Sequence, residues 1–127
     1  MFILIIGLPN SGKTTYSNIY NNVVHFDNLQ GHSIQKFNQA IDITKNNNNI
    51  ILEGVYSLRK QRIELLQNID VNIKKICVWI NTPYEICVER AKNCRPKIFV
   101  DAHYKVFQPP TYDEGWDEII VLQNCYL

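Results

Sequence analysis

The first fourteen residues constrain the fold more strongly than any other stretch of the chain. Residues Phe2–Ile6 are five apolar residues in succession, which is typical of a strand buried on both faces. They lead directly into Gly7–Thr14, which has the spacing G-x-x-x-x-G-K-[ST]. Glycines let the backbone curl so that successive N–H groups point inward and form a concave anion site. The sequence therefore predicts a phosphate-binding loop after the first strand.

The residues that follow extend this prediction. Lys13–Asn21 is predicted to be a helix whose N-terminal dipole favours a phosphate. Lys13 can reach the β- and γ-phosphates of a nucleotide, and the Thr14 hydroxyl can bind Mg²⁺. A chance match is the alternative, but the strand before and the helix after favour a nucleoside-triphosphate site. The expected nucleotide contacts are Gly7, Pro9, Asn10, Ser11, Gly12, Lys13, Thr14 and Thr15.

Length and charge limit the remaining possibilities. With 127 residues the chain is long enough for one core and too short for two, so we expect a single domain over residues 1–127. The formal net charge is +1 and 20% of the residues are charged, which excludes a broad basic face for duplex nucleic acid. A nucleic-acid partner would therefore be bound locally, at an end or as a single strand.

The cysteines and histidines show no metal-site or disulfide spacing. Cys77, Cys87, Cys94 and Cys125 favour reduced, buried thiols, and the three histidines are scattered. The chain begins with its first strand and has no apolar run of membrane-spanning length. We expect a cytoplasmic protein, or one in the host cytoplasm if it is viral, with no membrane or protein partner.

Apolar runs alternate with helical patterns along the rest of the chain. Further strands are predicted at 23–27, 50–52, 75–80 and 118–122, and helices at 34–41, 63–69, 82–92 and through 99–107. Thr82, Pro83 and Glu85 predict the start of a helix with Thr82 as its cap. This order predicts an α/β, three-layer P-loop NTPase fold with a five-stranded parallel sheet, helices on both faces and a short arginine-bearing lid.

Acidic residues end two of these strands, where ligands gather in parallel sheets. Asp27 follows the second strand and can accept the proton of a hydroxyl that attacks the γ-phosphate. The alternative is that Asp27 only caps the next helix. Glu53 ends the third strand and can hold Mg²⁺ together with Thr14, or it is a partly buried acid bonded to a neighbouring loop.

Two groups of basic residues are candidates for phosphate contacts. Arg90 and Arg95 lie at the end of a predicted helix and in the loop beyond, where Arg90 can contact the nucleotide and Arg95 can close over the triphosphate. A solvated charged surface is the alternative. Arg59 and Arg62 open another helix, where they contact either a substrate phosphate or only solvent.

The chain resembles P-loop kinases, and among them the kinase domain of polynucleotide 5′-hydroxyl kinases. Four pieces carry the resemblance: Gly7–Thr15, then Asp27–Leu29 with Ser33–Ala40, then Cys87–Pro96, and finally Tyr104–Trp116. The third piece is similar to the family's arginine-bearing lid. The fourth, an aromatic residue, prolines and threonine followed by Glu-Gly-aromatic, is the most specific.

The resemblance implies ATP-dependent phosphorylation of a polynucleotide 5′-hydroxyl end. It implies that Asp27 is the general base, that Lys13 and Arg95 stabilise the transferred phosphate, and that Thr14 binds Mg²⁺. The chain departs from the family at Gln30, where some members have arginine, and at Glu53-Gly54, where Asp followed by Asn or Thr is common. A small-molecule kinase for a sugar, nucleoside or antibiotic, and a nucleotide-binding regulatory module without activity, remain alternatives.

Overall fold

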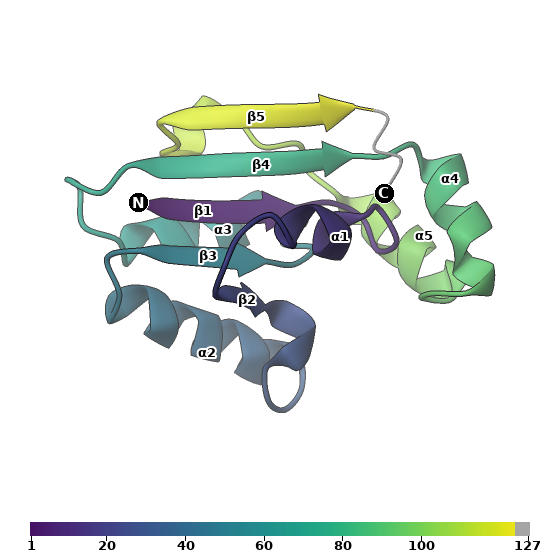
Figure 1. Ribbon diagram of the computed structural model, residues 1–127, viewed down its shortest axis with the longest axis horizontal. Coiled ribbons are helices and arrows are strands. Elements are labelled where there is room, and N and C mark those ends of the chain that lie inside the picture. The colour runs from purple at the N-terminus through teal and green to yellow at the C-terminus, as the bar shows by residue number, and fades with distance from the viewer. Residues whose placement is uncertain (124–127) are drawn as a thin grey trace.

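The computed structural model, which describes residues 1–123, contains a five-stranded parallel sheet (Figure 1). The strand order is β2-β3-β1-β4-β5, so the first strand lies at the centre. Its neighbours run parallel to it, with Leu4 opposite Leu52 on one side and Cys77 on the other. The bounds are β1 Phe2–Ile6, β2 Val23–His25, β3 Ile50–Glu53, β4 Lys75–Asn81 and β5 Glu118–Gln123.

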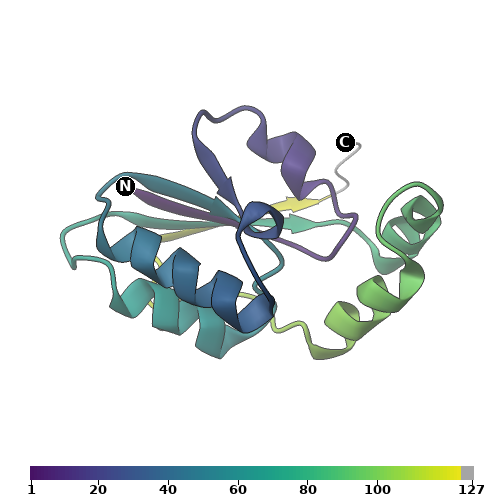
Figure 2. The same ribbon diagram turned by 90° about the horizontal axis from the view of Figure 1, so that it is seen from below.

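Helices cover both faces of this sheet (Figure 2). One face carries α1, the other carries α2 and α3, and α4 and α5 lie beyond the carboxyl ends of the strands. The bounds are α1 Lys13–Ser17, α2 Ser33–Lys45, α3 Arg59–Gln67, α4 Tyr84–Glu89 and α5 Lys97–Val106. Short 3₁₀ turns are η1 Phe26–Asn28, η2 Arg90–Lys92 and η3 Tyr112–Glu114. The three-layer fold predicted from the sequence is confirmed.

The central strand explains why its sequence is apolar throughout rather than alternating. Leu4 and Ile6 are buried against the layer that contains α2 and α3. Ile3 and Ile5 point to the opposite face and join a second core cluster with Val78. Because every residue of β1 is buried, no polar residue is tolerated along it.

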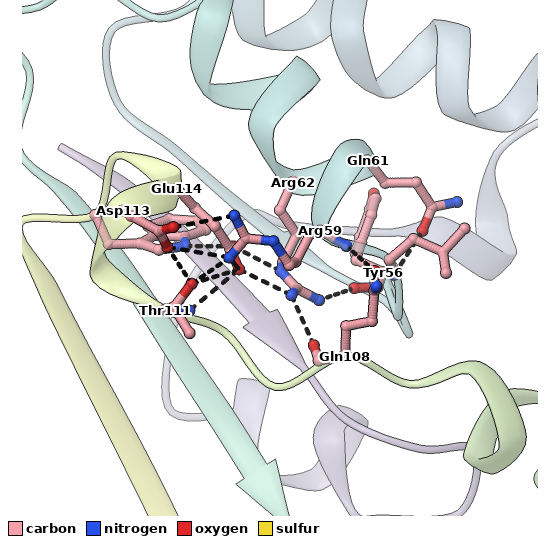
Figure 3. Close-up of polar contacts among 10 residues, drawn as sticks. Tyr56, Arg59, Gln61, Arg62, Gln108, Thr111, Asp113 and Glu114 are labelled. Atoms are coloured by element: carbon pink, nitrogen blue, oxygen red, sulfur yellow. Dashed lines mark hydrogen bonds and ion pairs between the residues drawn. The ribbon is translucent and has the colours of Figure 1, made fainter.

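A buried ion pair joins α3 to the segment before the last strand (Figure 3). Arg62 and Glu114 have fully buried side chains, and Arg62 Nε donates to Glu114 Oε1 at 2.8 Å. The other guanidinium nitrogens of Arg62 donate to the carbonyls of Tyr56 and Gln108. Arg59 bonds Asp113 and Thr111 of the same segment. These two arginines therefore hold the fold together, which corrects the expectation that they contact a phosphate or only solvent.

Several local predictions differ from the structure. The first helix ends at Ser17 rather than Asn21, and α4 ends at Glu89, with a 3₁₀ turn continuing to Lys92. The expected Thr82 cap is wrong, because Pro83 is the N-cap residue of α4 and no side chain caps the helix. The Thr82 hydroxyl donates to the Ser11 carbonyl oxygen. Cys94 is exposed rather than buried, and Cys125 lies outside the described residues.

Within residues 1–123, no helix is both long enough and apolar enough to cross a bilayer.

Candidate functional site: a phosphate-binding loop and its lid

The loop between β1 and α1 has the backbone geometry of an anion cradle. Gly12 has φ 100° and Asn10 has φ 66°, the left-handed region that glycine and asparagine tolerate best. A Cβ on Gly7 would lie 2.6 Å from Ser11 Oγ and 2.8 Å from the Ile80 carbonyl oxygen, so only glycine fits there. Ser11 is fully buried, and its hydroxyl has no hydrogen-bond partner in the described part of the chain. The loop therefore fits a ligand that supplies hydrogen-bond acceptors.

Lys13 lies inside this loop with its charge poorly compensated. Only 8% of the residue is exposed, and its Nζ donates to the Leu8 carbonyl oxygen at 2.8 Å. Burial lowers the pKa of Lys13, although the carboxylates of Glu53 and Asp27 oppose that change. A buried ammonium whose printed hydrogen bond goes to a neutral carbonyl gains strongly when an anion arrives. The position suits the β- and γ-phosphates of a nucleotide.

Glu53 and Thr14 converge beside the loop. Thr14 Oγ1 donates to Glu53 Oε1 at 3.4 Å, and Glu53 is 6% exposed at the carboxyl end of β3. The same carboxylate oxygen lies 2.6 Å from His25 Nδ1, at the end of the adjacent strand. Among the described residues no three His, Cys, Asp or Glu side chains gather as a metal cluster. Mg²⁺ usually takes one or two protein oxygens plus phosphate and water, so Thr14 and Glu53 fit this ion.

Asp27 lies in η1, directly after β2. Its carboxylate contacts Arg95 in the segment Cys87–Pro96, which we call the lid. Its Oδ1 is 3.1 Å from Arg95 Nη2, with side-chain exposures of 69% for Asp27 and 49% for Arg95. The guanidinium of Arg95 also lies over the Phe99 ring, 5.4 Å from its centroid. Since the charge of Asp27 affects the pKa of Lys13, the carboxylate is within electrostatic reach of the phosphate loop.

Arg90 contacts the loop itself. Its Nη1 donates to the carbonyl oxygen of Asn10 at 3.0 Å from η2. The structure thus brings together, at the carboxyl ends of the strands, five of the charged side chains expected at the site, while Arg59 and Arg62 lie elsewhere. Lys13 comes from α1, Asp27 from η1, Glu53 from β3, Arg90 from η2 and Arg95 from the loop after it.

Two histidines at this site have no signal in the sequence. His25 is bonded to Glu53, and His103 of α5 places its Nδ1 3.4 Å from the Ser57 hydroxyl. Burial lowers the pKa of His103, and the charges of Lys13 and Arg95 lower it further. The charges of the phosphate loop and of Arg95 therefore act on His103. Its place depends on how α5 packs across the loop after β3, which residue spacing does not reveal.

Comparisons with known proteins identify the fold. No protein-family model and no curated protein sequence matches the chain. A sugar kinase from Janibacter sp. HTCC2649, solved without ligand, has a TM-score of 0.71 at 12% identity over 96% of this chain and 84% of its own. A gluconokinase from Sinorhizobium meliloti 1021 has a TM-score of 0.68 at 10% identity, over 95% and 81%. At these identities the similarity shows the fold alone: a three-layer α/β fold with a five-stranded parallel sheet.

Proposed function

We propose that this protein is an ATP-dependent kinase that transfers the γ-phosphoryl group to a hydroxyl. One observation carries the proposal: a carboxylate and a guanidinium, Asp27 and Arg95, meet at 3.1 Å beside the loop that holds Lys13. Phosphoryl transfer needs a proton acceptor near the attacking hydroxyl and cations around the transferred group. These side chains supply both.

Each residue then has a separate task. Asp27 accepts the proton of the acceptor hydroxyl. The oxygen of that hydroxyl attacks the γ-phosphorus as the bond to the leaving ADP oxygen breaks. Lys13 and Arg95 neutralise the charge on the transferred group, and the loop amides hold the β-phosphate. Thr14 and Glu53 would hold Mg²⁺, which offsets phosphate charge when bound. Because the Asp27–Arg95 pair is exposed, exchanging it for a phosphate contact costs little.

For the acceptor we favour a polynucleotide 5′-hydroxyl end. The family resemblance of the Asp27 and lid segments supports it. So does the 69% exposure of the Asp27 side chain, since an open approach admits the end of a long strand. The resembling segment Tyr104–Trp116 supports this acceptor less, because Glu114 and Trp116 in it make contacts that stabilise the fold. Glu114 is paired with Arg62, and Trp116 stacks on Phe2.

A small polyhydroxyl compound is the second candidate acceptor. The two similar solved structures are a sugar kinase and a gluconokinase, which favours this alternative. Their similarity extends along nearly the whole chain, yet at 12% and 10% identity it does not carry the acceptor over.

The test offers the protein labelled ATP and Mg²⁺ with 5′-hydroxyl oligonucleotides of DNA and RNA, in parallel with sugars, gluconate, nucleosides and aminoglycosides. We expect label on the oligonucleotide 5′ end. Label only on a small compound would keep the kinase and replace the acceptor. Nucleotide binding with no labelled product would identify a nucleotide-binding module without transfer activity, and the proposal would fail.

A further inference from the structure

The side chain of Asn10 binds the lid and is therefore engaged within the protein. Its Nδ2 donates to the Arg95 carbonyl oxygen at 2.8 Å, and its Oδ1 accepts from the Arg95 backbone N–H at 3.0 Å. The same Nδ2 donates to the Cys87 carbonyl oxygen at 3.2 Å. We call these three hydrogen bonds the Asn10 clasp. They join the phosphate loop to both the helix before the lid arginine and the backbone of that arginine.

The clasp fixes the residue that carries the guanidinium. An amide that donates to the carbonyl and accepts from the N–H of one residue sets the position of that residue's backbone. Elsewhere in the lid, the backbone hydrogen bonds of the described residues are local, such as Asn93 N–H to the Arg90 carbonyl. Pro96 follows Arg95 and offers no N–H. Asn10 is thus the anchor that places the Arg95 backbone beside the loop.

We propose that Asn10 is a positioning residue: its side chain holds Arg95 so that the guanidinium stays between the phosphate loop and Asp27. The left-handed backbone at Asn10, with φ 66°, turns the side chain toward the lid and explains why an asparagine suits this position. The carbonyl of Asn10 accepts from Arg90 as well, so one loop residue contacts both lid arginines. The catalytic part of this inference rests on the proposed function.

Asn10→Gly removes the clasp while it keeps the backbone conformation, because glycine tolerates positive φ at no steric cost. Asn22→Gly is the matched control, since Asn22 has φ 59° and is exposed, in the turn that follows α1. We expect Asn10→Gly to lower kcat about 10- to 100-fold, the size of effect that a small misplacement of a catalytic group causes. Asn22→Gly should leave kcat unchanged.

A double-mutant cycle separates positioning from a general loss of structure. If Asn10 acts through Arg95, adding Asn10→Gly to Arg95→Ala should lower kcat by less than about threefold. If Asn10→Gly lowers kcat by the same factor in the wild type and in Arg95→Ala, the inference is overturned. An unchanged kcat in the Asn10→Gly single variant would also overturn it.

Amide hydrogen exchange tests the Asn10 clasp without any knowledge of the phosphoryl-acceptor substrate. The Arg95 amide N–H donates to Asn10 Oδ1, so its exchange should accelerate at least about tenfold in Asn10→Gly and stay unchanged in Asn22→Gly. An unchanged exchange rate in Asn10→Gly would overturn the clasp. Should the wild-type protein transfer no phosphate, the proposed function fails separately, and this exchange rate still decides whether Asn10 holds Arg95.

Discussion

The carboxylate of Asp27 lies 3.1 Å from the guanidinium of Arg95, although the two residues are 68 positions apart in the sequence. Asp27 follows an edge strand, and Arg95 belongs to the lid that is fastened to the phosphate loop through Asn10. The pair therefore places a carboxylate and a cation at one point. In the proposed function, that point is where a hydroxyl would meet the terminal phosphate of a nucleotide held by the loop.

Replacing Lys13 should separate nucleotide binding from stability. The buried ammonium is costly in the absence of an anion, so Lys13→Ala should leave the melting temperature of the ligand-free protein unchanged or higher. The affinity for ATP·Mg²⁺ should fall by about 10- to 100-fold, since a charged hydrogen bond is lost. Calorimetric titration and thermal melts with and without ATP·Mg²⁺ measure both quantities.

Lys45→Ala is the control, because Lys45 is exposed at the end of α2. A Lys13→Ala protein with wild-type affinity for ATP·Mg²⁺ would show that Lys13 does not contact the nucleotide.

The Arg62–Glu114 pair should dominate the stability of the segment before β5. Arg62→Ala leaves Glu114 buried without its cation, and we expect a loss of about 3–5 kcal/mol in the free energy of unfolding. Lys74→Ala breaks the exposed Lys74–Glu118 contact of 3.6 Å and should cost about 0–1 kcal/mol. Urea denaturation compares the two variants. Equal losses would mean that the buried pair contributes no more than a surface pair.

The same network predicts how stability depends on pH. Burial of Glu114 raises its pKa, but hydrogen bonds from Arg62 and Trp116 outweigh burial and leave the pKa below its ordinary value of 4.5. A carboxyl with a lowered pKa in the folded state contributes stability above its unfolded pKa and loses it as the pH falls through the folded value.

Stability should therefore fall below about pH 4.5, and Glu114→Gln should show a weaker dependence on pH in that range. Urea denaturation between pH 7 and pH 3 measures it. The Asp113 carboxyl, whose pKa a hydrogen bond from Arg59 lowers from 3.8 to about 2, should lose its contribution to stability at still lower pH, as the pH falls from 3.8 toward 2. Identical pH profiles for the wild type and Glu114→Gln would contradict this account.

The sequence predicts the layers of this fold because the signals are local. Consecutive apolar residues mark the buried strands, and the glycine spacing marks the loop between β1 and α1. The ends of strands then locate Asp27 and Glu53. The predicted Thr82 cap is wrong because α4 begins at Tyr84 with Pro83 as its N-cap, so Thr82 lies one residue before the cap position. Its hydroxyl donates to the Ser11 carbonyl oxygen.

The contacts missing from the sequence-based picture all join distant segments. Arg62 looks like a surface residue of a basic helix until η3 brings Glu114 against it. Asn10 occupies one of the unspecified positions of the loop motif, and its role is seen only in the structure, where its side chain accepts from the Arg95 N–H. Both depend on where a remote segment packs, and neither composition nor periodicity encodes that position.

The most direct test of the account is the effect of Asp27→Asn on turnover and on nucleotide affinity, measured on one preparation with the acceptor that accepts label. Asparagine keeps the shape of the side chain and cannot accept the hydroxyl proton. We expect kcat to fall by roughly 10²–10⁴-fold while the Kd for ATP·Mg²⁺ stays within about threefold of the wild type. An unchanged kcat would show that the proton goes elsewhere and would contradict the central claim.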